Sequence, residues 1–193
     1  MEGAGKRNAR LTCHAFADAC FVQRFRVLAA LKGHDNWVQC LVCIPQRGEV
    51  WSGSADRTII CWEWSTCAQV GRLHGHNDHV NSLARVGNRV YSGSQDGVIR
   101  VWDAKSRECV QEVSSGMRNI ARLCGLSTEV WVCGVGDVVQ IRDAGNISVL
   151  KGSVEGCSGY TSAVAQVGHM IWGGGPRVRL LCADGFGINT GIR

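Results

Sequence analysis

The apolar residues of this chain fall in short runs separated by turn residues, and one pattern of such runs recurs along the sequence. The four matching stretches are EVWSGSADRTIICWE from Glu49, RVYSGSQDGVIRVWD from Arg89, EVWVCGVGDVVQIRD from Glu129 and MIWGGGPRVRLLCAD from Met170. Their aromatic residues Trp51, Tyr91, Trp131 and Trp172 follow one another at about 40 residues. A period of this size predicts a fold built from stacked copies of one small unit.

Each copy is predicted to form four short strands. In the first copy the apolar runs are residues 38–42, 50–54, 58–62 and 67–73, and a tight turn at Ala55-Asp56-Arg57 separates the middle two. No segment has a sustained helical period. One such sheet cannot bury both of its faces, whereas sheets stacked around an axis cover one another. We therefore expect an all-β fold, a β-propeller of four-stranded antiparallel blades, with about four blades present.

Two dipeptides mark the first two copies. Gly33-His34 is followed by Trp62-Glu63, and Gly75-His76 by Trp102-Asp103, and the segment GHDNWVQCLV from Gly33 aligns with GHNDHVNSLA from Gly75. These pairs resemble the Gly-His and Trp-Asp marks of WD (WD40) repeats. The resemblance covers roughly residues 28–184; the first two copies match well and the last two are degenerate.

The resemblance implies a buried hydrogen-bonded network in each well-matched blade. The matching residues are His34, Ser52, Asp56 and Trp62 in the first copy, and His76, Ser92, Asp96 and Trp102 in the second. The residue types fit, because an indole N–H only donates, a carboxylate only accepts, and imidazole and hydroxyl groups do both. A hydrolase would also use Ser, His and Asp, but a set that recurs with the same spacing beside a Trp is better explained as architecture.

The later copies depart from this pattern. The third has Gly136 at the Asp position and Arg142 at the Trp position, with Asp137 one residue later as a partial substitute. The fourth has Gly156-Cys157 in place of Gly-His and lacks both the Asp and the Trp. We expect these blades to depend on apolar packing instead.

The repeats also suggest a division of the chain. Residues 1–23 are expected to be an N-terminal extension and 24–193 the propeller region, with blades at about 33–73, 74–113, 114–152 and 153–193. Residues 24–31 (RFRVLAAL) resemble the outer strand of a preceding blade. The chain could thus be a fragment, half of an assembly or, less favoured, a four-bladed ring. An open set of blades would expose apolar faces, which favours pairing.

In WD propellers, partners commonly bind the face on which the first strand of each blade begins. The resemblance places several residues of this chain there. The candidates are Asp35, Trp37, Gln39, His79, Asn81, Gln95 and Tyr160, with Ala55, Asn77, Asn119 and Ser162 beside them. Trp37 is the strongest, because a Trp brings a large rigid surface and one polar atom. The alternative is that it packs on a neighbouring loop.

The composition limits the classes of partner and the cellular location that can be expected. The chain has 193 residues, 45% of them hydrophobic, and a net charge of +5 that is spread rather than clustered, so nucleic acid is not the expected partner. It has no apolar run long enough for a membrane span and no signal-like N-terminus. Most of its 11 cysteines lie in apolar runs, which favours reduced thiols in the cytoplasm, or alternatively the nucleus. Cys40 and Cys43 would point to opposite faces of a strand, so no metal or cofactor is expected.

The function expected from these observations is a non-catalytic scaffold that mediates protein–protein association, with other proteins bound through the propeller face. Three alternatives stay open. The chain could be the substrate-recognition subunit of a ubiquitin ligase, the non-catalytic propeller region of a larger enzyme such as an inositol polyphosphate phosphatase, or a polyanion binder. Self-association is also compatible with the sequence.

Overall fold

The computed structural model describes residues 29–136, 138–155, 163–167, 170–174 and 178–181. The chain divides into two units, Met1–Leu31 and Lys32–Arg193, and the strands all belong to the second. Residues 29–31, at the end of the segment predicted as an outer strand, are not in a strand, and residues 24–28 lie outside the described part.

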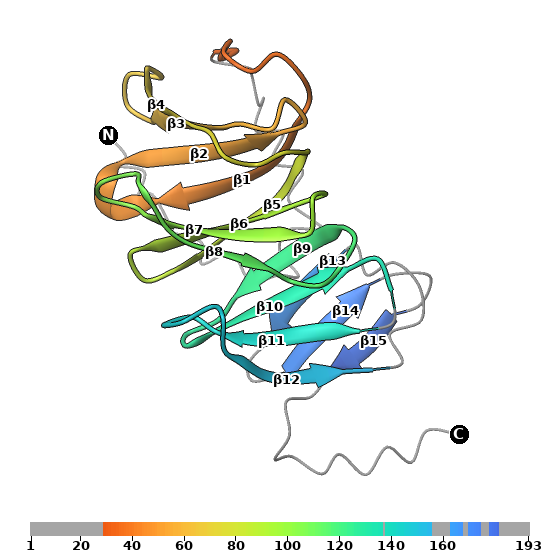
Figure 1. Ribbon diagram of the computed structural model, residues 1–193. Helices are drawn as coiled ribbons and strands as arrows, with labels where there is room; N and C mark the ends of the chain where they lie inside the picture. Colours follow the sequence, from red (N-terminus) through yellow and green to blue (C-terminus); the bar gives the residue numbers. More distant parts are fainter. Residues whose placement is uncertain (1–28, 137, 156–162, 168–169, 175–177, 182–193) are drawn as a thin grey trace, which may run out of the picture. The chain divides into compact units, whose positions relative to one another are not determined.

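The second unit consists of consecutive antiparallel sheets, which we call blades 1 to 4 (Figure 1). Blade 1 contains β1 (Val38–Ile44), β2 (Glu49–Ser54), β3 (Ile59–Glu63) and β4 (Gln69–Leu73), with a short 3-10 helix at Pro45–Arg47. Blade 2 contains β5 (Val80–Val86), β6 (Arg89–Ser94), β7 (Val98–Asp103) and β8 (Cys109–Ser114). Blade 3 contains β9 (Ile120–Gly125), β10 (Glu129–Gly134), β11 (Val139–Asp143) and β12 (Leu150–Val154). The described part of blade 4 contains β13 (Ala163–Val167), β14 (Met170–Gly174) and β15 (Val178–Leu181).

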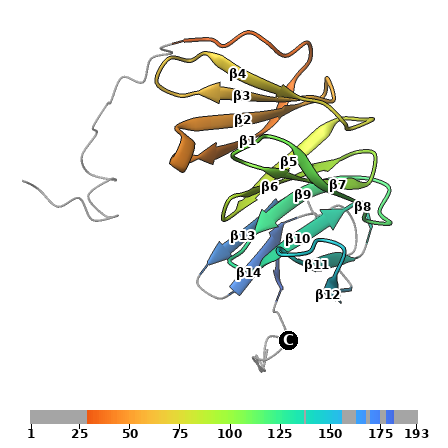
Figure 2. The same ribbon diagram turned by 60° about the vertical axis from the view of Figure 1, so that its left-hand side comes forward.

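The strands of each blade pair in chain order, and the first strands β1, β5, β9 and β13 lie next to one another in the same sequence (Figure 2). No described residue belongs to an α-helix. The prediction of an all-β propeller architecture of four-stranded antiparallel blades is confirmed. The observed strands of blade 1 differ from the predicted runs by one or two residues at several ends. The fourth strand begins at Gln69 rather than 67, because Cys67 has a φ of 60°, outside the extended range of a strand.

The register of the strands repeats along with the sequence. Val38 pairs with Ser54, Val80 with Ser94 and Ile120 with Gly134, and each of these first-strand pairings contains an irregularity at the same place. Such a bulge bends a strand and increases its twist. Because bulge and register recur, equivalent side chains in successive blades point in equivalent directions.

Apolar side chains pack between successive blades. One buried cluster joins Trp51 and Ile59 of blade 1 to Val80, Leu83 and Trp102 of blade 2. A second joins Tyr91 and Ile99 of blade 2 to Ile120, Leu123 and Val130 of blade 3. Blades 2 and 3 therefore each cover an apolar face of the blade before them, which is the packing that the repeat predicts.

Candidate functional site

A chain of hydrogen bonds crosses the interior of blade 2. Trp102 Nε1 donates to Ser92 Oγ at 2.8 Å, and that hydroxyl lies 2.7 Å from His76 Nε2. The other imidazole nitrogen, Nδ1, lies 3.1 Å from Asp96 Oδ2. Every donor meets an acceptor only when the imidazole is neutral with its proton on Nδ1, so that it donates to the carboxylate and accepts from Ser92.

Blade 1 contains the same chain at similar distances. Trp62 Nε1 donates to Ser52 Oγ at 2.8 Å, Ser52 Oγ lies 2.7 Å from His34 Nε2, and His34 Nδ1 lies 2.7 Å from Asp56 Oδ2. Thr58 adds a hydroxyl that donates to Asp56 Oδ1 at 2.7 Å. The structure thus brings together all eight residues of the two sets named from the sequence.

The two aspartates also anchor the loops that precede each first strand. The backbone N–H of Asp35 donates to Asp56, and that of Asn77 donates to Asp96. Burial raises the pKa of both carboxyls, but hydrogen bonds that stabilise the charged form outweigh it and hold each pKa below its usual value. For Asp56 the first of these bonds comes from Thr58, and for Asp96 from the Asn77 backbone. Burial lowers the pKa of His76, against the raising effect of Asp96.

This arrangement is not a nucleophilic one. Ser52 and Ser92 are buried, and each hydroxyl oxygen already accepts from an indole N–H. Because both serines are buried, a substrate carbonyl has no direct access to either oxygen. The arrangement instead connects a strand, a turn and a loop, and so fixes the position of the loop.

Blade 3 holds its loop in a different way. Arg142, at the position of Trp62 and Trp102, is buried, and burial lowers the pKa of its guanidinium. Its Nη1 donates to Ile147 O at 3.0 Å and its Nε to Gln140 Oε1 at 2.9 Å. The loop before β9 is bound to blade 2, since Ser115 donates from Oγ and from its backbone N–H to Gly97 O. Gly136 does not provide a carboxylate, and Asp137 lies outside the described residues.

The loops that these contacts fix form one face of the blades, which we call the loop face. In three blades the loop before the first strand accepts a backbone hydrogen bond from the turn after the second strand. The pairs are Ala55 N–H to Trp37 O, Gln95 N–H to His79 O and Val135 N–H to Asn119 O, at 2.9, 2.9 and 3.1 Å. The loop face therefore presents equivalent positions, one beside the other, in blades 1 to 3.

Trp37 is the most prominent residue of the loop face, with 80% of its surface exposed. Its backbone N–H is held by Asn36 Oδ1 at 2.8 Å, and the N–H of His79 is held by Asp78 in the same way. These local bonds fix the backbone from which each side chain projects. Trp37 does not pack under a neighbouring loop, so its large apolar surface is available to a partner.

The other predicted binding residues have different surroundings. Asp35, Gln39 and Gln95 are exposed, and Asp35 lies 3.6 Å from Arg72. The side-chain amide N–H groups of Asn81 donate to Asn119 Oδ1 and Ile120 O, at 2.9 and 3.0 Å. These hydrogen bonds join blades 2 and 3. Tyr160 and Ser162 lie outside the described residues.

Val135 is a residue of the loop face that the sequence reasoning missed. It occupies the position of Ala55 and Gln95, and it is exposed. The 40-residue spacing that identified Gln95 would have identified it as well. Arg57 and Arg118 are also exposed on these loops and were not singled out.

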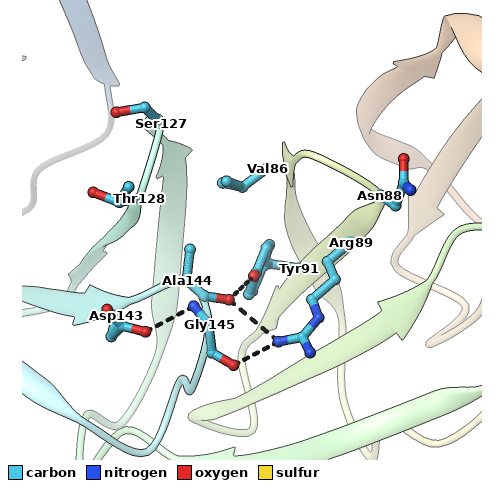
Figure 3. Close-up of a pocket in the computed structure, with 9 residues that line it drawn as sticks. All are labelled: Val86, Asn88, Arg89, Tyr91, Ser127, Thr128, Asp143, Ala144 and Gly145. Carbon is cyan, nitrogen blue, oxygen red and sulfur yellow. Dashed lines mark hydrogen bonds between the residues drawn. The ribbon is translucent and has the colours of Figure 1, made fainter.

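A separate hollow of about 460 Å³ lies between blades 2 and 3 (Figure 3). Tyr91 donates its hydroxyl to Ala144 O, and Arg89 Nη1 donates to Gly145 O at 2.6 Å. The two side chains therefore bind the β11–β12 turn of blade 3 to β6. Their polar groups join the blades rather than converging on a vacant position in the hollow.

Other kinds of site find no support within the described residues. No group of three or more His, Cys, Asp or Glu side chains is placed to hold a metal ion. Cys40 is buried and Cys43 is exposed. No helix in this part of the chain is long and apolar enough to cross a bilayer.

The geometry defines consecutive propeller blades with a Trp-Ser-His-Asp network in the first two. Residues 25–63 and 67–103 match the family model described as "WD domain, G-beta repeat". The predicted resemblance of the first two copies to WD repeats is confirmed.

Several curated proteins resemble it in sequence. It is 27% identical over 146 residues to small ribosomal subunit protein RACK1y of Oryza sativa subsp. japonica, covering 73% of this chain and 43% of that protein. It is 28% identical over 99 residues to THO complex subunit 6 of Arabidopsis thaliana, covering 48% and 27%. The chain thus spans less than half the length of these relatives.

Solved structures share the fold. The structure of U3-55K matches with a TM-score of 0.71 at 21% identity, over 78% of this chain and 50% of that one. The computationally designed Ika4 protein matches with a TM-score of 0.68 at 22% identity, over 82% of this chain and 98% of the designed one.

Proposed function

We propose that this chain is a non-catalytic scaffold that binds other proteins through its loop face, with Trp37 as the principal anchor. The observation that carries the proposal is the exposure of Trp37 on a loop whose backbone is fixed at both ends. Asp56 binds the N–H of Asp35, and Ala55 donates to Trp37 O. A large apolar side chain on a fixed backbone can bind with less loss of backbone conformational entropy than one on a mobile loop.

The neighbouring blades add polar groups suited to orienting a partner. His79 and Gln95 lie at the corresponding positions of blade 2, and Asn119 and Val135 at those of blade 3. A partly apolar centre among polar side chains is the usual composition of a protein-binding surface. The names of the ribosomal and THO-complex relatives refer to multiprotein assemblies, which agrees with a scaffold role.

The chemistry of the buried groups supports the absence of catalysis in this proposal. Burial raises the pKa of the thiols of Cys40 and Cys61 to about 12, so neither is a thiolate nucleophile at neutral pH. Free thiols occur at six positions of the described part, which fits the proposed location in the cytoplasm. They are Cys40, Cys43, Cys61, Cys67, Cys109 and Cys124.

Substitution of Trp37 tests the proposal. Wild type, Trp37→Ala and a matched control, Trp64→Ala, would be used as baits in parallel affinity purifications with quantitative mass spectrometry. Trp64 is also exposed, at 51%, but it lies in the β3–β4 turn, where its backbone N–H donates to Gly48 O. We expect specific partners to be retained by wild type and by Trp64→Ala, and to be reduced at least about tenfold with Trp37→Ala. Equal recovery by all three baits would refute the proposal.

A further inference from the structure

The first strand of blade 1 is far more exposed than its counterparts in blades 2 and 3. Val38, Val80 and Ile120 occupy the same register position, opposite Ser54, Ser94 and Gly134. Val80 and Ile120 are fully buried, whereas Val38 is 50% exposed.

A second position shows the same difference. Leu41, Leu83 and Leu123 pair with Ser52, Ser92 and Val132. Leu83 and Leu123 are 7% and 4% exposed, and Leu41 is 65% exposed. In blades 2 and 3 these residues pack on the preceding blade. Blade 1 carries the same apolar side chains with no described segment over them, and we call Val38 and Leu41 its open face.

The surface that receives such a face has a defined feature. A Cβ at Gly53 would lie 2.7 Å from Val80 Cγ1, and one at Gly93 would lie 2.5 Å from Ile120 Cγ2. Real Cβ atoms do not approach other carbons so closely, so a blade accepts the Val or Ile of its successor because it has glycine in its second strand.

Blade 4 has a glycine in the equivalent place. Gly53 pairs with Ile59 at the start of the third strand, Gly93 with Ile99, and Gly174 with Val178. Blade 3 has Cys133 there, paired with Val139, so Gly174 restores the arrangement of blades 1 and 2. Blade 4 therefore carries the receiving feature, and blade 1 carries the apolar face that fits it.

We propose that the open face of blade 1 is covered by blade 4 of a second copy of this chain, and that the reciprocal contact closes a two-fold ring of eight blades. Blade 4 of the same chain does not cover the open face, since Val38 and Leu41 stay exposed with blade 4 in place. The contact is head to tail, and such a contact closes when the rotation per subunit suits it.

Size and continuity support this occupant. The interface continues the packing seen between blades 1 and 2 and between blades 2 and 3, with the same residue types. Eight blades lie within the range of known propellers.

The mass in solution tests the proposal directly. Wild type, Leu41→Arg and a control, Val110→Arg, would be measured by light scattering across a wide concentration range. Val110 is a similarly exposed apolar residue, at 52%, on the outer strand β8, so the control adds the same charge away from the open face. We expect wild type and Val110→Arg to be dimers, and Leu41→Arg to dissociate with a constant raised roughly 100-fold or more. Because Leu41 is exposed within its own chain, the substitution leaves the packing of blade 1 intact.

A mixing experiment separates the two faces. Leu41→Arg blocks the open face and Gly174→Leu blocks the receiving face, so each variant alone should be a monomer. An equimolar mixture contains one intact pair of faces and should form a one-to-one heterodimer. A wild-type monomer at every concentration, a dimer unaffected by Leu41→Arg, or a series of larger oligomers would each overturn the ring. Circular dichroism shows whether Gly174→Leu is folded. If it is not, the masses of wild type, Leu41→Arg and Val110→Arg test the proposal without the mixing experiment.

Discussion

Ser92 lies between two partners in the interior of blade 2, and it has a different role toward each. Its Oγ accepts from Trp102 and donates to His76, whose other nitrogen donates to Asp96. A chain of this kind leaves no buried donor unsatisfied as long as all four members are present. Removing Asp96, at one end of this chain of hydrogen bonds, should therefore lower the free energy of unfolding more than the loss of a surface contact would.

Asp96→Ala tests this at the residue scale. The substitution removes the acceptor for His76 Nδ1 and for the backbone N–H groups of Asn77 and Val98. We expect the free energy of unfolding to fall by about 1–3 kcal/mol, measured by urea denaturation. Asp103→Ala is the control, because Asp103 accepts from the exposed N–H groups of Lys105 and Ser106, which can bind water instead. Equal effects of the two substitutions would contradict a network role for Asp96.

The sequence could predict these residues because the same four types recur at the same spacing and complement one another as donors and acceptors. The contacts that replace the network in blade 3 could not be predicted from the sequence. Arg142 satisfies its guanidinium on Ile147 O and Gln140, and Ser115 binds Gly97 of the preceding blade. These partners occur once, so no period indicates them.

At the scale of elements, a charged contact joins the turn of one blade to a strand of the blade before it. Glu49 at the start of β2 is buried, and Arg107, in the turn between β7 and β8, binds its Oε1 at 2.8 Å. Arg47 and the indole of Trp51 also donate to this carboxylate. Burial raises the pKa of Glu49, but these donors outweigh it and hold the pKa below its usual value. The carboxylate thus stabilises the junction of blades 1 and 2.

Glu49→Gln should weaken that junction. The amide keeps the shape of the side chain but removes the charge that both arginines bind, and we expect a loss of about 1–3 kcal/mol in the free energy of unfolding. Glu129→Gln is the matched control in blade 3. Glu129 is more exposed, and its partners are more distant, with Trp131 Nε1 at 3.2 Å and Lys151 Nζ at 3.7 Å. A larger effect at Glu129 than at Glu49 would contradict this interpretation.

The strands and their turns could be predicted from the alternation of apolar runs and turn residues, but the contacts between blades could not. The repeat aligns each copy with the others, and so it identifies equivalent positions without indicating which of them meet. Arg107 and Glu49 occupy different positions of the repeat. Their contact depends on the rotation between blades, which no local pattern contains.

At the scale of the whole molecule, three titratable groups of the two networks make stability depend on pH in the same direction. The pKa of His76 is lowered by burial, so unfolding exposes a histidine that binds a proton more readily. The pKa values of Asp56 and Asp96 are lowered because hydrogen bonds outweigh burial, so their carboxyls also bind protons more readily in the unfolded chain. For all three groups, acid therefore favours the unfolded state.

The histidine and the aspartates lose their contributions to stability over different pH ranges, which makes the prediction testable. The contribution of His76 is complete above its ordinary pKa of 6.5 and is lost as the pH falls below that value, because the protonated ring cannot accept from Ser92. The contribution of the aspartates is complete above their ordinary value of 3.8 and is lost only below it. We expect the melting temperature, measured by calorimetry at one protein concentration, to fall between about pH 7.5 and about pH 5 and more steeply below about pH 4. His76→Gln should melt lower at neutral pH but show a flatter upper limb, because its side chain has no proton to gain. If the variant kept the full slope of the wild type in that upper range, the decline would belong to other groups and the neutral state assigned to His76 would be wrong.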